Sequence, residues 1–73
     1  MLKKRSVTIR GHATSYSIEN EFHAALREIA ERRGRPVAAL IASIDVNRPA
    51  DTNLSSAIRI FVLEHYRDAA GAK

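Results

Sequence analysis

Apolar and polar residues alternate through the N-terminal part of the chain. The apolar residues Val7 and Ile9 stand at odd positions before Gly11, whereas Tyr16 and Ile18 stand at even positions after it. Strict alternation is typical of a half-buried β-strand. Because glycine adopts positive φ angles at little cost, a bulge or a turn at Gly11 would explain why the inward positions change from odd to even. We therefore predict extended backbone on both sides of this glycine.

Two helices are predicted after the strand, because apolar residues recur there at intervals of three and four. The first helix covers residues 19–33 and ends at Gly34. Its acidic residues come early and its arginines come late, which suits the helix dipole. The second helix begins at Pro36, a residue type favoured in a first turn, and ends near residue 45.

The C-terminal third of the chain predicts a loop and a third helix. Residues 46–53, VNRPADTN, are polar and contain a proline, which is typical of a surface loop. Apolar spacing then predicts a helix that begins at Leu54 and ends near Arg67, followed by a loose tail at residues 68–73. No linker or repeat divides the chain. We predict one domain over residues 1–73, mainly α with one N-terminal β-strand.

A lone strand needs a partner, because its backbone donors and acceptors are otherwise left unpaired beside buried apolar side chains. The strand either folds on itself as a hairpin around Gly11 and His12, or pairs with the same strand of a second molecule across a two-fold axis. The length of 73 residues, the 12 alanines and the absence of cysteine favour a core shared between two chains.

The positive charge of the chain is concentrated at its N-terminus. Lys3, Lys4, Arg5 and Arg10 contribute +4, and the remaining 8 Lys and Arg residues are balanced by 8 Asp and Glu residues. Such a distribution favours a polyanionic partner bound by residues 1–12, either as a basic arm or as an extended strand. A solvated basic tail is the alternative interpretation.

The sequence lacks the motifs of the common catalytic and cofactor sites. It contains no glycine-rich phosphate loop, no metal-ligand spacing and no nucleophile with a neighbouring base. We therefore expect no enzymatic activity, no cofactor and no metal. No apolar run is long enough for a membrane helix, and the N-terminus lacks the apolar core of a signal peptide. We expect a soluble, cytoplasmic protein without membrane contact.

The order of these elements resembles the ribbon-helix-helix (Arc/MetJ-type) family. The resemblance rests on the strand ATSYSI, the helix ENEFHAALREIAERR, Gly34 and the segment RPVAALIASID. The segments KRSVTIRGHATSYSIE and NLSSAIRIFVLEHYR extend it to a short bacterial subfamily with an extra helix. It implies an intertwined homodimer with a two-stranded intermolecular antiparallel ribbon and three helices. It further implies that the ribbon enters the major groove of double-stranded DNA and that the protein is a transcriptional regulator, a repressor.

The resemblance also implies where the ribbon meets DNA. Its outward positions would be Ala13, Ser15 and Ser17, which are weak readers of base edges compared with Arg, Lys, Asn or Gln. Specificity is then modest, or the basic segment before Gly11 contributes to it. Within that segment Arg10 is the first candidate for a DNA contact. Residues 3–10 either extend the ribbon through a bulge or form a separate strand or arm.

These arguments give three sets of predicted site residues. The DNA-binding set is Arg5, Thr8, Arg10, His12, Ser15 and Ser17. The phosphate-contact set is Lys3, Lys4, Arg35, Asn53 and Ser55, because the start of either the second or the third helix could present its amides to a phosphate. The dimer-core set is Tyr16, Ile18, Phe22, Leu26, Ile29, Leu40, Ile41, Ile58 and Phe61. A protein-interaction module or an antitoxin built on the same dimeric scaffold is the alternative function.

Overall fold

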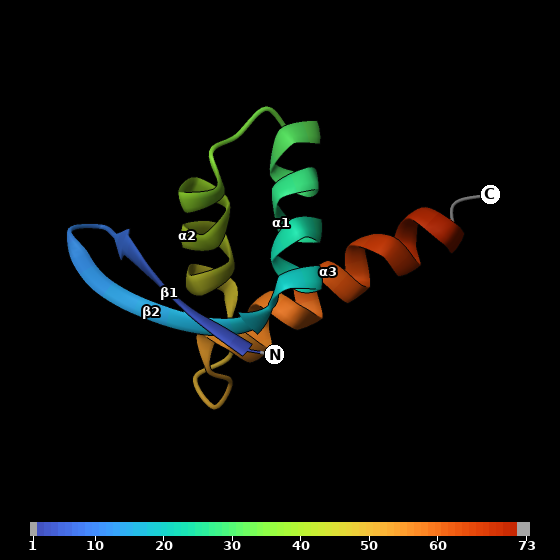
Figure 1. Cartoon of the computed structure of the whole chain (residues 1–73). Helices are drawn as coiled ribbons and strands as arrows, with labels where there is room; N and C mark the ends of the chain where they lie inside the picture. Colours follow the sequence, from blue (N-terminus) through green and yellow to red (C-terminus); the bar gives the residue numbers. More distant parts are fainter. Residues whose placement is uncertain (1, 72–73) are drawn as a thin grey trace.

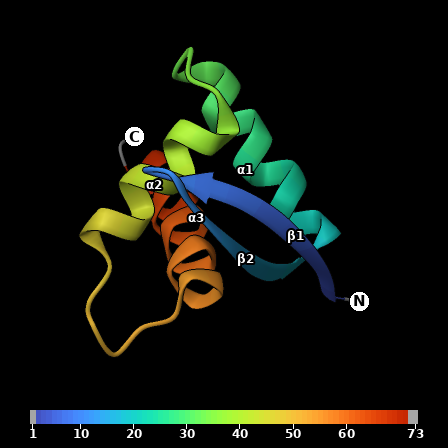
Figure 2. The same cartoon turned by 90° about the vertical axis from the view of Figure 1, so that its left-hand side faces the viewer.

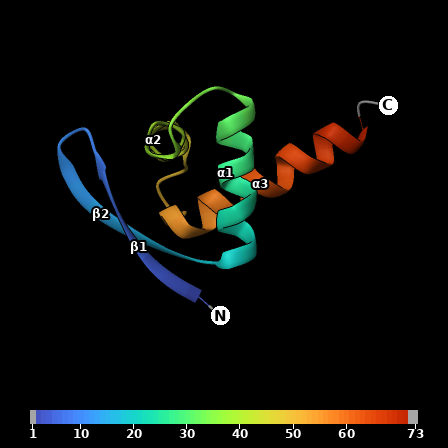
Figure 3. The same ribbon diagram turned by 45° about the horizontal axis from the view of Figure 1, so that its top comes forward.

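The computed structural model describes residues 2–71 and contains one β-hairpin and three helices (Figure 1). The elements follow in the order β1 (Leu2–Ile9), β2 (His12–Glu19), α1 (Asn20–Arg32), α2 (Val37–Asn47) and α3 (Leu54–Gly71). The hairpin lies on one side of α1 and α2, and α3 runs from the hairpin toward the opposite side of the molecule (Figures 1 and 3).

The prediction of a single N-terminal strand is wrong, because β1 and β2 pair with each other as an antiparallel hairpin within one chain. Arg10 and Gly11 connect them, with φ angles of 51° and 81°. Positive φ at both central residues is the requirement of a two-residue type I′ turn, whose twist matches that of the strands. Across this turn odd residues pair with even ones, so Val7 and Tyr16 share a face. This pairing explains the change of parity in the sequence.

A glycine ends α1 as the sequence predicts. Gly34 has a φ angle of 63°. Its N–H donates to the carbonyl of Glu31 at 3.1 Å, and the N–H of Arg35 donates to the carbonyl of Ala30 at 3.0 Å. These two bonds form a Schellman motif, which satisfies carbonyls that the end of the helix would otherwise leave unpaired.

The third helix begins at the predicted residue but is longer than predicted. The side-chain oxygen of Asn53 accepts the backbone N–H of Ser56 at 2.8 Å, so Asn53 is the N-cap of α3. The helix continues to Gly71. The prediction of a loose tail is therefore wrong for residues 68–71, and residues 72–73 lie outside the described part of the chain.

One chain closes its own hydrophobic core. The fully buried large side chains come from the hairpin and from all three helices, and they are Ile18, Leu26, Ile29, Leu40, Ile41 and Ile58. Burial of each such side chain contributes about 1.5–3 kcal/mol relative to exposure. Tyr16 is also buried, while Phe22 and Phe61 pack against the core and are partly buried. All nine residues of the predicted dimer core thus contribute to the core of a single chain.

Candidate nucleic-acid interface

The hairpin has one face that points away from the helices. In the register, Lys4 pairs with Ser17, Ser6 with Ser15 and Thr8 with Ala13. We call these six residues the outer face. All are exposed except Ser17, which is half-buried. Because their side chains are short apart from that of Lys4, the outer face is flat and rich in hydroxyl groups.

Arg5 lies on the opposite, inner face of the hairpin. It pairs with Tyr16, which is buried, and its own side chain is partly covered. The Nε atom of Arg5 is buried and has no hydrogen-bond partner among the described residues. Burial raises the pKa of the Tyr16 hydroxyl, and the nearby positive charge of Arg5 offsets part of that rise. Of the predicted DNA-binding set, Arg5 is therefore separated from Thr8 and Ser15.

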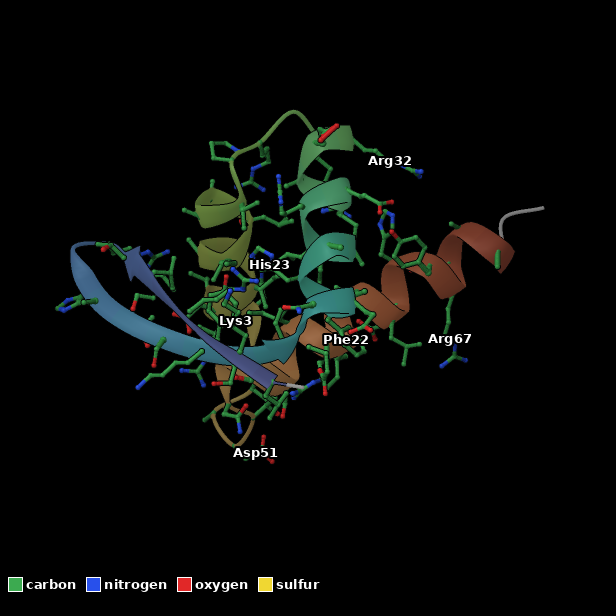
Figure 4. All side chains as sticks on the ribbon, viewed as in Figure 1. Lys3, Phe22, His23, Arg32, Asp51 and Arg67 are labelled. Carbon is green, nitrogen blue, oxygen red and sulfur yellow. The ribbon has the colours of Figure 1, made fainter. Side chains whose placement is uncertain are left out.

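Like charges converge beside Arg5. His23, on α1, is half-buried, and burial followed by the charges of Arg5, Arg27 and Lys3 lowers its pKa. Figure 4 shows Lys3 and His23 where the hairpin passes in front of the helices. The charged groups that act on His23 are all cationic, and none is acidic. This environment favours the neutral form of the imidazole.

The predicted residues Arg10 and Arg35 are brought together although they are far apart in sequence. Arg10 belongs to the turn between β1 and β2 and lines a cavity together with residues of α2. Figure 2 shows the tip of the hairpin beside α2. Arg35 immediately precedes α2, and both arginines line the same cavity, of roughly 360 Å³. His12, the residue after the turn, is exposed and pairs with the buried Ile9, so it lies on the inner face near this tip.

The edge of β2 is covered at one end by α3. The N–H of Ser17 donates to Oγ of Ser55 at 2.8 Å, and Nη2 of Arg59 donates to the carbonyl of Ser17 at 3.2 Å. Nε of Arg59 also donates to Oε1 of Glu19 at 3.0 Å. Bonds from the backbone N–H of Glu19 and from Arg59 lower the pKa of the Glu19 carboxyl. Sequence analysis missed Arg59 and Glu19, which are 40 positions apart and carry no local signal.

The two predicted phosphate contacts at the start of α3 have structural roles. Asn53 caps the helix with its side-chain oxygen, and Ser55 binds the backbone of β2. The N-terminal end of α3 is thus packed against the hairpin. The start of α2 differs, because Arg35 there is exposed and next to the cavity at the hairpin tip.

A second cavity, of roughly 420 Å³, lies between α2 and α3. It is lined on α2 by Leu40 and Ile44 and on α3 by Ile60 and Phe61. The ring of Phe61 lies 5.1 Å from the guanidinium carbon of Arg33. Beyond it the projecting half of α3 exposes Leu63 and Tyr66. An apolar surface of this kind is a candidate for contact with another protein.

Over residues 2–71 there is no group of three His, Cys, Asp or Glu side chains placed to hold a metal ion. Among the helices of this same range, none combines the length and the apolar character needed to cross a membrane.

Comparison with known proteins agrees with this arrangement. The family profile described as ribbon-helix-helix domain matches residues 2–66, which is most of the chain. The comparisons with curated proteins and with solved structures gave no match. The profile begins at the first residue of β1 and ends within α3, so it includes the hairpin and most of the third helix. The chain therefore belongs to the ribbon-helix-helix domain family, a family of DNA-binding regulators.

Proposed function

We propose that the protein is a homodimeric, sequence-specific DNA-binding regulator, a repressor, that inserts its β-strands into the major groove of duplex DNA. The observation that carries this proposal is the hairpin itself. It presents an exposed polar face and is strongly basic, since Lys3, Lys4, Arg5 and Arg10 belong to it and Glu19, at its last position, is its one acidic residue. The major groove of B-DNA admits a two-stranded β-ribbon.

The free edge of β2 supports a dimer. In a hairpin with a two-residue turn, hydrogen-bonded pairs alternate with non-hydrogen-bonded pairs, beginning with a hydrogen-bonded pair at the turn. Ala13, Ser15 and Ser17 belong to the second kind, so their backbone groups point away from β1. The groups of Ser17 bond to α3. Those of Ala13 and Ser15 have no backbone partner within residues 2–71 and remain for a second chain.

A two-fold axis at Thr14 uses this edge without disturbing α3. Ala13 of one copy then faces Ser15 of the other, and each of the two such pairs makes two backbone hydrogen bonds. The next pairing would need the backbone of Ser17, which α3 already occupies. The resulting sheet has the two β2 strands at its centre and the two β1 strands outside.

The two central strands of this sheet match the width of the DNA major groove, whereas the whole sheet is wider than the groove. Strands are spaced about 4.8 Å apart, so the two β1 strands stand roughly 14 Å apart, against a major groove about 12 Å wide. The central β2 strands would enter the groove, and Lys4 on each outer strand would reach the phosphates along its walls. Ser15 on β2 can accept or donate single hydrogen bonds to base edges, which gives modest specificity.

A salt series tests the proposal. Affinity for a random-sequence duplex is measured from about 50 to 200 mM salt for the native chain, for Lys4→Gln and for the control Arg67→Gln, whose side chain lies on α3 far from the hairpin (Figure 4). We expect affinity to fall steeply with salt and the slope to decrease by about one counterion per chain in Lys4→Gln only. A folded native chain that does not bind duplex DNA at low salt would exclude the proposal.

Binding of another protein is the second candidate function. The exposed side chains of Ile60, Leu63 and Tyr66, next to the cavity between α2 and α3, favour it. An antitoxin that binds a toxin is one form of this function. Under this proposal Leu63→Ser abolishes the protein complex and leaves DNA binding unchanged.

A further inference from the structure

The cavity at the hairpin tip is a second charged feature, distinct from the outer face. Its lining residues belong to the β1–β2 turn, to Arg35 and to α2. The turn and α2 lie side by side in Figure 2. The lining consists of two arginines, two polar residues and three small or branched apolar residues, namely Arg10, Arg35, Ser43, Asn47, Ala39, Ala42 and Val46. No acidic residue belongs to the lining. Its volume of roughly 360 Å³ is within the range of small-ligand pockets.

The backbone fixes both arginines. Arg10 is held by the type I′ turn, in which it adopts a φ angle of 51° that non-glycine residues rarely take. The N–H of Arg35 belongs to the Schellman motif at the end of α1. The positions of these two residues therefore follow from the turn and the helix end.

The Arg35 side chain is anchored as well. Its Nη2 atom donates to Oγ of Ser43 at 3.1 Å and to the carbonyl of Ala39 at 3.3 Å. Since a guanidinium has five N–H donors, the remaining donors of Arg35 stay available for a ligand. Asn47 is also held, because its Nδ2 atom donates to the carbonyl of Ser43 at 2.9 Å.

The charges of the cavity are not compensated within the fold. The ion pairs found in residues 2–71 are Arg48–Asp45 and Arg59–Glu19, and neither includes an arginine of the cavity. Two arginines that line one cavity bring like charges near each other, and an anion between them offsets their repulsion. Arginine matches tetrahedral oxyanions through paired N–H donors, which makes phosphate the best fit.

We infer that this cavity binds a phosphate-class anion between Arg10 and Arg35. The phosphate comes from the DNA backbone, in which case the inference rests on the proposed function, or from a free phosphate-bearing molecule. If the phosphate belongs to DNA, the hairpin tip and α2 contact the same phosphate group of the backbone. The arms of the experiment below separate the two sources.

The first arm uses inorganic phosphate and the full chain without DNA. Phosphate is titrated against chloride at equal ionic strength while NMR follows the amides and guanidinium groups. The variants are Arg10→Asn, which keeps a residue that tolerates positive φ, and Arg35→Gln, with Arg32→Gln as the control on an exposed helix end that points away from the hairpin (Figure 4). We expect saturable shifts at Arg10, Arg35 and Ser43, lost in the two variants and retained in the control. The inference is overturned if phosphate changes the NMR chemical shifts of these residues no more than chloride does, whether or not the protein binds DNA.

The second arm measures duplex DNA affinity for the same variants and for the double variant. If the two arginines share one DNA phosphate, each single change weakens binding about tenfold and the double change weakens it little more, because either loss already breaks the site. The DNA source is excluded if the affinity losses of the two single variants multiply in the double variant, or if none of the variants loses affinity for DNA. The phosphate detected in the first arm then represents a free phosphate-bearing molecule. A native chain that binds phosphate but not DNA would remove the proposed function and retain the anion site.

Discussion

The backbone N–H of Ser17 donates to the hydroxyl oxygen of Ser55 across 38 positions of sequence, at 2.8 Å. This bond joins the end of β2 to the first turn of α3. It also limits how far the edge of β2 is free, because Ser17 is bonded whereas Ser15 is not. The position of α3 therefore sets the length of strand that a second chain can use.

Replacement of Ser55 by alanine should loosen this end of β2. The N–H of Ser17 loses its acceptor in a half-buried position, which costs about 1 kcal/mol of the free energy of unfolding. Hydrogen exchange of the Ser17 amide should become faster, and urea unfolding should give the loss of stability. Ser56→Ala is the matched control, because no hydrogen bond of that hydroxyl is found in the described structure. Equal effects of the two changes would contradict a specific role for Ser55.

Replacement of Ser15 by proline should separate the dimer without unfolding the chain. The N–H of Ser15 points away from β1, so a single chain loses no ladder bond, but a second chain loses a donor. Sedimentation should show a folded monomer for Ser15→Pro. Thr14→Pro is the comparison, because its N–H bonds across the hairpin to β1 and its loss should disrupt the fold. A dimeric Ser15→Pro variant would rule out pairing through this edge.

Local signals in the sequence predicted the helices but not the partner of the strand. Gly34 and the apolar spacing before it place the end of α1 correctly, because a Schellman end depends on neighbouring residues. Alternation at Val7 and Tyr16 shows extended backbone but does not say which chain supplies the partner. The sequence does not mark the turn, because Arg10 stands where Asn or Asp is usual in a type I′ turn.

The remaining differences come from contacts and propensities that periodicity does not record. The helix α3 extends beyond Arg67 through Ala69 and Ala70. Both alanines are exposed, so periodicity of burial does not predict them as helical, but alanine has the highest helix propensity. The bonds of Arg59 to Ser17 and Glu19 appear only once β2 and α3 are packed together. The common cavity of Arg10 and Arg35 likewise requires the hairpin to fold back beside α2.

Two changes at neighbouring positions of the turn should differ in their effects on stability. Gly11→Ala should destabilise the fold by about 1 kcal/mol, because the φ angle of 81° is strained for any residue with a Cβ atom even where nothing lies within 4 Å of it. Arg10→Asn should leave stability unchanged or raise it by up to about 1 kcal/mol, because asparagine tolerates positive φ. Thermal unfolding of both variants measures this. A destabilised Arg10→Asn would show that the arginine side chain supports the turn.

Replacement of the partly covered arginine at position 5 should stabilise the chain. Arg5→Met keeps the apolar stem against Tyr16 while it removes a buried Nε atom without a partner and one charge of the cluster around His23. An unsatisfied buried donor costs about 1–3 kcal/mol, so we expect a higher melting temperature. Arg32→Met, at an exposed site, is the control. A lower melting temperature for Arg5→Met alone would indicate that Arg5 has a stabilising partner, such as a second chain.

Stability should fall as the pH is lowered through the range where histidine titrates, and His23 should be one cause. Burial and the charges of Arg5, Arg27 and Lys3 lower the pKa of His23 in the folded chain, so the unfolded chain binds more protons there. The free energy of unfolding from His23 is thus fully present above the unfolded pKa of about 6.5 and is lost as the pH falls toward the folded value. Urea unfolding at several pH values from about 7.5 to 5 gives the free energy of unfolding at each pH. This free energy should depend less on pH in His23→Gln than in the native chain. His12→Gln, at an exposed position, serves as the comparison. An NMR titration in which the imidazole of His23 gains its proton above pH 6.5 would reverse the sign of this effect.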